Sequence, residues 1–246
     1  MEGVLDNMCG FAGFCEYREA FPGQEQHWLD LARRMARRIS HRGPDSQGAH
    51  YSPHCVLAHA RLAVMDPEHG AQPMSRPVAD QEVTIAYNGE VYNAPELRQE
   101  LESLGYSFET ACDTEVVLAS YLHWGPDCAQ KLNGIFAFAV DDPVNQKTFL
   151  CRDRFGVKPL FYTLQEGKLV FASEIKGLFE FPGVRPIVGR EGLCEVFGLG
   201  PARTPGCGVF AGIRELKPGH IAMFDRLGFR DLPYFQLEAL PHEESY

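Results

Sequence analysis

The apolar residues of this chain occur in short segments bounded by glycine, proline and polar residues, and this spacing constrains the fold more than any other feature. The longest unbroken apolar run covers residues 135–140, which is far too short to cross a bilayer. The 24 glycines and 17 prolines indicate frequent turns, so many short strands are expected. The spacing therefore predicts a strand-rich chain without a membrane-spanning helix.

Strand-like segments recur over most of the first 172 residues. An apolar stretch after Cys9 is typical of a buried first strand. Two later segments flank Gln165-Glu166-Gly167, which is typical of a hairpin turn. The hairpin strands are expected at residues 160–164 and 168–172, and the other strands at 56–60, 83–87, 135–140 and 148–152.

Three segments with helical periodicity form a cluster in the chain. Residues 27–39 place apolar side chains on one face and four arginines outside it, which indicates a solvated outer face. A second helix begins after Asn93 and has an apolar stripe that includes Leu104. The third covers residues 114–123, with Asp113 at its cap position. Because strands outnumber helices and do not alternate with them regularly, the predicted class is α+β with antiparallel sheet.

Charge and cysteine usage exclude several classes of protein. The formal net charge of −10 argues against a nucleic-acid surface or an anionic membrane as the main partner. The N-terminus has no charged-then-apolar signal pattern, and the eight cysteines show no CxxC pair or zinc-ligand spacing. Free thiols, no metal site and a cytoplasmic location are therefore expected.

The common catalytic signatures are absent, since no Walker-type phosphate loop, HExxH or GxSxG occurs in the sequence. The remaining candidates are a thiol and short polar clusters, and each has a purely structural alternative. Cys9 alone is typical of a small buried apolar residue. Asn88-Gly89 alone is typical of a tight hairpin turn, and Asp113 alone of a helix cap. Arg152-Asp153-Arg154 alone is typical of an exposed, salt-bridged turn.

The order of these clusters is more informative than any one of them. Along the chain stand MCGFAGF, SHRGPD, HARLAVMD, YNGEVYN, CDTEVVL, LNGIFAFAV, RDRFGVKPLFY and FASEIKGL. Together they resemble the glutaminase domain of class II glutamine amidotransferases, which are N-terminal-nucleophile hydrolases. The resemblance runs from Cys9 to about residue 178 and more loosely through ELKPGH. Within that class, NGE-x-YN and RDRFGVKPLFY are most similar to the branch of glutamine-hydrolysing asparagine synthetases.

The resemblance implies a fold and a set of catalytic groups. The implied fold is the four-layer αββα sandwich, with helices outside two antiparallel sheets. Cys9 matches the nucleophile, and the general base is its own α-amine, with an unperturbed pKa near ~8, or a water held by that amine. Asn88, through its side-chain amide, and Gly89, through its backbone N–H, match the donors to the oxyanion.

The resemblance also implies a binding site for glutamine. Arg61 matches the arginine that binds the substrate α-carboxylate, a task suited to a planar forked cation. Glu90 and Asp113 match the acidic groups that bind the α-ammonium. Leu62 and Met65 match residues that line the pocket, where Asn88 and Gly89 also contact the substrate.

The family's mature chain begins at the nucleophilic cysteine, whereas Met1 to Asn7 and Met8 precede Cys9 here. Residues 1–8 are expected to be a leader or a misassigned start, residues 9–235 the glutaminase domain, and residues 236–246 the start of a linker. Translation from Met8 would need the loss of one methionine only, and this option is favoured over a cleaved leader. A backbone amide at Cys9 would not be a usable base.

The family's synthetase half, with its SGGxDS loop, does not occur in this sequence. We therefore expect no cofactor in this chain, with ATP and Mg bound only by a synthetase domain that acts as its partner. The expected function is hydrolysis of glutamine to supply ammonia for asparagine synthesis. Two alternatives stay open: a related synthetase with a different acceptor, or an inactive regulatory module blocked by its leader. A homodimer also stays open.

Overall fold

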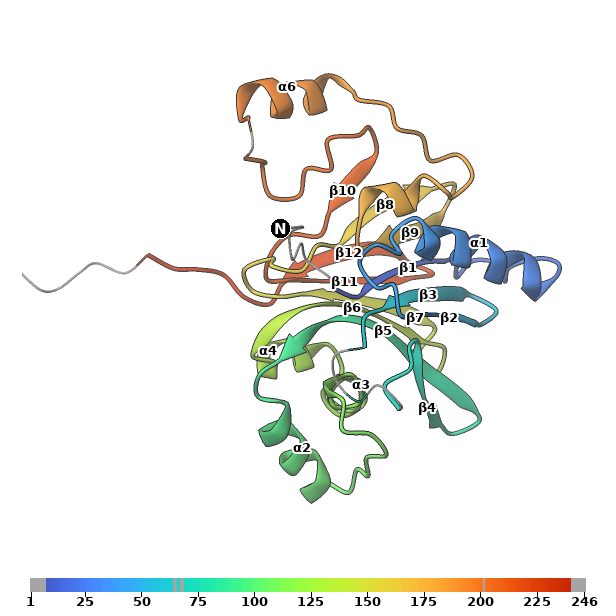
Figure 1. Cartoon of the computed structure of the whole chain (residues 1–246), viewed down its shortest axis with the longest axis vertical. Coiled ribbons are helices and arrows are strands. Elements are labelled where there is room, and N and C mark those ends of the chain that lie inside the picture. Colours follow the sequence, from blue (N-terminus) through green and yellow to red (C-terminus); the bar gives the residue numbers. More distant parts are fainter. Residues whose placement is uncertain (1–7, 64–65, 67–68, 201, 240–246) are drawn as a thin grey trace, which may run out of the picture.

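Two antiparallel sheets lie face to face at the centre of the molecule (Figure 1). The structure is a computed structural model, and it describes residues 8–63, 66, 69–200 and 202–239. Sheet A has the spatial order β10 (Ile213–Glu215), β8 (Phe161–Gln165), β9 (Lys168–Ala172), β1 (Gly10–Cys15), β3 (Cys55–Arg61) and β2 (Ser46–Tyr51). Sheet B has the order β12 (Gly228–Pro233), β11 (His220–Asp225), β7 (Lys147–Arg152), β6 (Gly134–Asp142), β5 (Gln81–Val91) and β4 (Met74–Val78).

Helices cover the outer face of each sheet. The face of sheet A away from sheet B packs against α1 (Glu25–Arg37) and α5 (Ile175–Leu178). The outer face of sheet B packs against α2 (Ala94–Ser103), α3 (Asp113–Trp124) and α4 (Cys128–Lys131), with the 3-10 turn η1 (Gly125–Asp127) between the last two. The four-layer αββα sandwich and the α+β class are therefore confirmed.

The strand β1 shows how the sequence creates these layers. Its side chains alternate, because successive residues of a strand point to opposite faces of the sheet. Phe11 and Cys15 belong to the core between the sheets, whereas Ala12 and Phe14 belong to the core beneath α1. Large residues of sheet A meet small residues of sheet B between the sheets, namely Phe11, Leu57 and Phe171 against Ala86, Ala137 and Ala139. This complementary packing lets the two sheets approach closely.

The predicted strands and helices are all present, with small shifts at their ends. The hairpin between β8 and β9 turns through Glu166 and Gly167, which have φ angles of 49° and 82°. Leu104 is 49% exposed and lies just beyond α2, so its inclusion in the apolar stripe was wrong. The helix α2 ends one residue earlier than its periodicity indicates, and the chain turns at Gly105, where φ is 94°.

Two structural alternatives from the sequence are also wrong. Asn88 and Gly89 do not form a hairpin turn, since both lie within β5 and pair with Ala137 and Phe136 of β6. The Arg152 side chain is buried rather than exposed, and it forms an ion pair with Glu215 at 2.9 Å. Asn88, Gly89 and Arg152 are therefore used in contacts between distant segments rather than in local turns.

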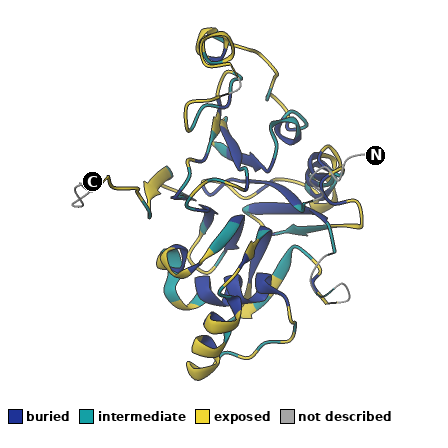
Figure 2. Ribbon diagram, turned by 60° about the vertical axis from the view of Figure 1, so that its left-hand side comes forward, coloured by how far each residue is buried: buried dark blue, intermediate teal, exposed yellow. Residues whose placement is uncertain are grey.

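The helix α6 (Arg190–Gly198) stands apart from the two-sheet body (Figure 1), and almost all of it is exposed (Figure 2). Leu193, Val196 and Phe197 are 48%, 48% and 84% exposed. Glu195 accepts hydrogen bonds from the backbone N–H and the hydroxyl of Thr204, which holds the following loop to the helix. Within the described part of the chain, no helix combines the length and apolar character needed to cross a membrane.

Candidate active site

Cys9 is positioned by the pairing of β1 with β3. Gly10 lies opposite Ala60, so the preceding Cys9 lies beside the residues that follow β3. The Leu62 N–H donates to Cys9 Sγ at 3.3 Å, and the Sγ donates to the Leu62 carbonyl at 3.5 Å. The thiol is therefore held at the end of sheet A by the backbone of a single residue.

The loop between α1 and β2 supplies a second support for Cys9. Arg42 Nε donates to the Cys9 carbonyl at 3.1 Å, and its Nη1 donates to Glu174 Oε1 at 3.0 Å. The Arg42 side chain is almost fully buried. Sequence reasoning did not assign Arg42 to the site, although its position in the SHRGPD motif was a signal.

The protonation of the Cys9 thiol is set by competing effects. Burial raises its pKa above the usual value, while the Leu62 N–H and the guanidinium groups of Arg61 and Arg42 lower it. Burial is the largest of these effects, so the net direction is upward. A thiol in this state needs a neighbouring base before it can act as a nucleophile.

Asn88 presents a hydrogen-bond donor without a partner. It lies in the middle of β5 and is 2% exposed, and its Nδ2 has no hydrogen-bond partner among the described residues. The neighbouring Gly89 must be a glycine, because a Cβ there would lie 2.5 Å from the Ile135 carbonyl oxygen. Buried amide donors are normally paired, so the free Nδ2 is suited to a ligand oxygen.

Asp113 is held by sheet B rather than used as a helix cap. Cys112 occupies the N-cap position, and Asp113 is the first residue of α3. Its Oδ2 accepts hydrogen bonds from the Tyr87 hydroxyl at 2.6 Å and the Val91 N–H at 3.0 Å. The prediction of a cap was therefore wrong, because the buried carboxylate turns toward β5. Burial and the Asp113 charge raise the pKa of Tyr87, which remains a donor.

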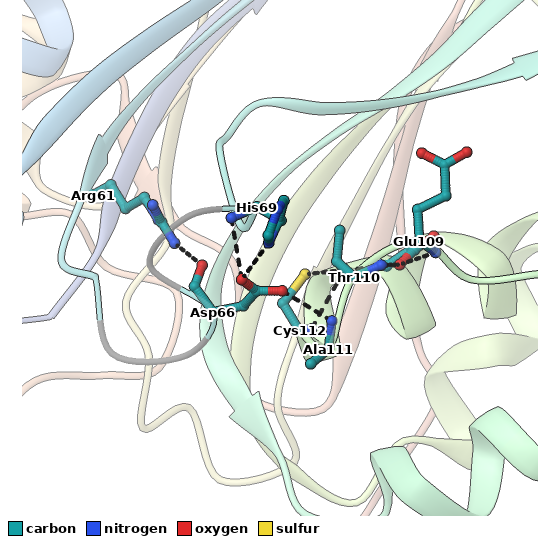
Figure 3. Close-up of polar contacts among 8 residues, drawn as sticks. Arg61, Asp66, His69, Glu109, Thr110, Ala111 and Cys112 are labelled. Atoms are coloured by element: carbon teal, nitrogen blue, oxygen red, sulfur yellow. Dashed lines mark hydrogen bonds and ion pairs between the residues drawn. The ribbon is translucent and has the colours of Figure 1, made fainter.

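Two further cations face Cys9. Arg61 is almost fully buried, and its Nη2 donates to the Asp66 carbonyl at 2.7 Å (Figure 3). Lys158 Nζ donates to the Met8 Sδ at 2.7 Å, and burial lowers the pKa of Lys158. Lys158 was not assigned to the site, although it lies in the RDRFGVKPLFY motif, because it contacts a residue 150 positions away.

These groups line one cavity of about 250 Å³. Of the eight predicted site residues, the cavity brings together seven: Cys9, Arg61, Leu62, Asn88, Gly89, Glu90 and Asp113. The eighth, Met65, lies outside the described residues, as do residues 1–7 of the expected leader. Residues that sequence reasoning did not assign complete the lining: Met8, Gly70, Gln72, Tyr87, Cys112, Thr114 and Lys158. No cluster of three or more potential metal ligands occurs in the part of the chain that the structure describes.

The cavity combines a nucleophile with groups that recognise charge. A thiol beside an unpaired amide donor suits attack on a carbonyl whose oxygen becomes negative. A buried guanidinium and a carboxylate at the same cavity suit a ligand that carries both a carboxylate and an ammonium group. The arrangement can therefore perform covalent chemistry on a small zwitterionic amide.

Comparison with known proteins agrees with this chemistry. The glutamine amidotransferase domain family matches residues 8–235. Asparagine synthetase [glutamine-hydrolyzing] 3 of Bacillus subtilis is 44% identical over 97% of this chain. Asparagine synthetase [glutamine-hydrolyzing] 1 of the same organism is 42% identical over 70% of this chain. The chain spans only 38% and 26% of the length of these two relatives.

Solved structures share the fold at low identity. A B. subtilis glutamine phosphoribosylpyrophosphate amidotransferase has a TM-score of 0.65 and 16% identity, and the match covers 93% of this chain and 50% of that one. A structure described as the allosteric regulatory enzyme of purine biosynthesis has a TM-score of 0.67 and 18% identity, with the same coverage.

Proposed function

Because the chain belongs to the glutamine amidotransferase domain family, we propose that it hydrolyses glutamine to glutamate and ammonia through a thioester on Cys9. The observation that carries the proposal is the single cavity around Cys9 that gathers the unpaired Asn88 amide, Arg61 and Asp113. Each of these residues matches a different requirement of an amino-acid amide substrate.

The first half of the reaction forms the thioester. The Cys9 α-amine takes the thiol proton, and the Sγ attacks the side-chain amide carbon of glutamine. Negative charge develops on the former carbonyl oxygen, where the Asn88 Nδ2 and the Gly89 N–H donate hydrogen bonds. The tetrahedral intermediate collapses as the α-ammonium of Cys9 returns its proton to the leaving nitrogen, which departs as ammonia. Water then attacks the thioester carbon and releases glutamate.

The base requires a processed N-terminus. While Met8 is attached, the nitrogen of Cys9 is an amide and cannot accept a proton at working pH. The Met8 side chain also lines the cavity, in contact with Lys158. Both facts support the proposal that the active form begins at Cys9 and that a form that keeps Met8 is inactive.

Substrate recognition follows the charges of the cavity. Arg61 binds the α-carboxylate of glutamine, and Asp113 binds the α-ammonium with the help of Glu90 at the exposed rim. Leu62 lines the cavity next to the thiol, and its backbone already contacts Sγ. Met65 is proposed as a further contact on the basis of the resemblance alone.

The ammonia acceptor is proposed from the relatives. Both B. subtilis proteins are named glutamine-hydrolysing asparagine synthetases, and they contain a large region that this chain does not match. We propose that ammonia passes to a synthetase domain of that kind, which alone would bind ATP and Mg. The free state of all eight cysteines supports a cytoplasmic location.

The test combines intact mass with a glutaminase assay on the same sample. A chain that begins at Cys9 should release glutamate from glutamine, and Cys9→Ala should abolish this while the fold is retained. Cys194→Ala, which removes an exposed thiol on α6, is the matched control and should keep full activity. Turnover by Cys9→Ala, or by a chain whose mass shows that Met8 is retained, would overturn the mechanism.

A further inference from the structure

Asp66 connects the end of β3 in sheet A with the turn that leads into α3 (Figure 3). Its backbone carbonyl accepts the hydrogen bond from Arg61 Nη2 at 2.7 Å. Its Oδ2 accepts a hydrogen bond from the Ala111 N–H at 3.0 Å, in the turn that precedes α3. One residue therefore touches both the cation at the end of β3 and the turn that leads into Asp113.

The backbone of Asp66 adopts a conformation that few residues tolerate. Its φ angle is 41°, in the left-handed region that aspartate, asparagine and glycine enter most readily. In this conformation the carbonyl serves Arg61 while the carboxylate serves Ala111 and, through Oδ1, the N–H and Nδ1 of His69. The Ala111 N–H and then His69 hold the pKa of the Asp66 carboxyl below its usual value, so it accepts these bonds as an anion.

Other side chains also bind the turn that Asp66 contacts, among them Arg98 of α2, which donates to the Cys112 carbonyl, and Glu115. The Glu115 carboxylate accepts hydrogen bonds from the N–H groups of Glu109 and Thr110 and from the Thr110 hydroxyl. Glu115 belongs to α3 itself, so it fixes the turn relative to its own helix. The contacts of Asp66 link the turn to Arg61.

We propose that Asp66 is a positioning residue that holds Arg61 and Asp113 at the separation needed to bind both charges of an α-amino acid. The proposal rests on the proposed function, because it assigns these two residues to the substrate α-carboxylate and α-ammonium. The two charged groups of the substrate are attached to one carbon, so their separation is nearly constant. The protein groups that bind them must keep a matching separation, and small displacements are costly.

Three substitutions separate the side chain of Asp66 from its backbone. Asp66→Asn keeps the left-handed preference and one acceptor oxygen, Asp66→Gly keeps the conformation without a side chain, and Asp66→Ala loses both. We expect KM for glutamine to rise roughly tenfold in Asp66→Gly and at least as much in Asp66→Ala, with a smaller rise in Asp66→Asn. The value of kcat should change by less than about threefold, because no atom of Asp66 lines the cavity next to the thiol.

The matched control is His69→Ala, which removes the imidazole contact to the same carboxylate and leaves the bonds from the backbone N–H of residue 69 and from Ala111 in place. Its KM should equal that of the parent chain. A KM for Asp66→Gly equal to that of the parent, or a loss in kcat with KM unchanged, would overturn the positioning role. Thermal unfolding of each variant identifies any loss that reflects folding alone.

Binding separates this inference from the proposed function. L-Glutamine titrated by calorimetry into the Cys9→Ala chain measures affinity without turnover, and Asp66→Gly in that background should weaken binding by the same roughly tenfold. If the processed parent binds glutamine but does not hydrolyse it, the proposed function fails while the Asp66 test is still decided by affinity. If binding is tight and unaffected by Asp66→Gly, the inference alone fails. Absence of binding by the parent overturns both.

Discussion

The two walls of the cavity differ in charge and in the way their residues are held. The wall from sheet A carries the thiol of Cys9 and the cation Arg61, and Arg42 supports it from outside the lining through the Cys9 carbonyl. The wall from sheet B carries the neutral amide of Asn88 and the carboxylate of Asp113. Neither sheet alone combines the thiol with the unpaired amide donor, so the site depends on how the sheets stack.

The walls also differ in backbone regularity. The groups of sheet A lie at strand ends, with Cys9 before β1 and Arg61 at the last residue of β3. Asn88 lies inside β5, where pairing with β6 continues on both sides of it. The unpaired Asn88 amide is therefore on the wall with the more regular backbone, while Cys9 and Arg61 lie where loops begin. Preorganised donors contribute most to catalysis when they do not move during the reaction.

Removal of the Asn88 amide should produce the largest loss. Asn88→Ala is expected to lower kcat by roughly 10²–10³, about 3–4 kcal/mol, with little change in KM, because the amide acts mainly on the developing charge. The measurement is a steady-state glutaminase assay of the processed chain. Asn93→Ala is the matched control, since the Asn93 side chain contacts only Lys131 and Asn133 in the described structure. A loss below threefold for Asn88→Ala would remove it from the oxyanion site.

A hydrogen bond between His59 and Tyr87 joins the two walls, and it makes the stability of the folded chain depend on pH. His59 of β3 is fully buried, and its Nε2 donates to the Tyr87 carbonyl of β5 at 2.9 Å. Burial lowers the pKa of His59 to about 4, below the ordinary 6.5. The unfolded chain then binds more protons than the folded chain between these values, so the folded state loses stability as the pH falls from 6.5 toward 4.

The variant His59→Gln retains a donor but cannot be protonated. The free energy of unfolding of the parent, relative to this variant, should fall by about 3 kcal/mol between pH 7 and pH 4 in urea titrations. Asp141, whose pKa burial raises to about 6, acts in the opposite direction but is common to both proteins. If the difference in the free energy of unfolding between the parent and His59→Gln stayed constant with pH, His59 would not be a buried neutral imidazole that links β3 to β5.

The opposite charges of the walls can be tested with substrate analogues. Arg61→Ala should weaken glutamine binding by about 2 kcal/mol, roughly 30-fold, because it removes a charge-assisted bond. The same variant should bind 4-aminobutanamide, which lacks the α-carboxylate, as the parent does. Asp113→Asn should weaken glutamine binding to a smaller extent and leave glutaric acid monoamide, which lacks the α-amine, unaffected. If either variant weakened the binding of both analogues equally, the division of charge between the walls would be contradicted.

Much of the fold was predictable because its signals are local. Short apolar segments bounded by glycine, proline and polar residues indicated β3, β6, β7 and the β8–β9 hairpin, and the resemblance then supplied the layer order. The helix α6 was not predicted, because a short segment with two glycines and little burial has weak periodicity. Its existence depends on contacts with later residues such as Thr204.

The site was predictable only where its residues belong to ordered motifs. Taken singly, Asn88-Gly89 is typical of a turn and Asp113 of a cap, and the structure rejects both alternatives because β5 continues through the pair and the carboxylate turns to Tyr87. Lys158 and His59 lie in the motifs RDRFGVKPLFY and HARLAVMD, but they were not assigned to the site, since their contacts join segments that are distant in sequence. No local pattern reports such contacts.

The exposed apolar face of α6 also affects how this chain behaves in a concentrated solution. The helix exposes an apolar surface that favours association, formed by Leu193, Val196 and Phe197. The net charge of −10 opposes association, because copies of the chain repel one another. Added salt screens the repulsion between charges that are farther apart than the Debye length, about 10 Å at 0.1 M, and leaves the apolar attraction in place. Colloidal stability should therefore decline as ionic strength rises, so dilute buffers suit storage of this chain better than concentrated salt.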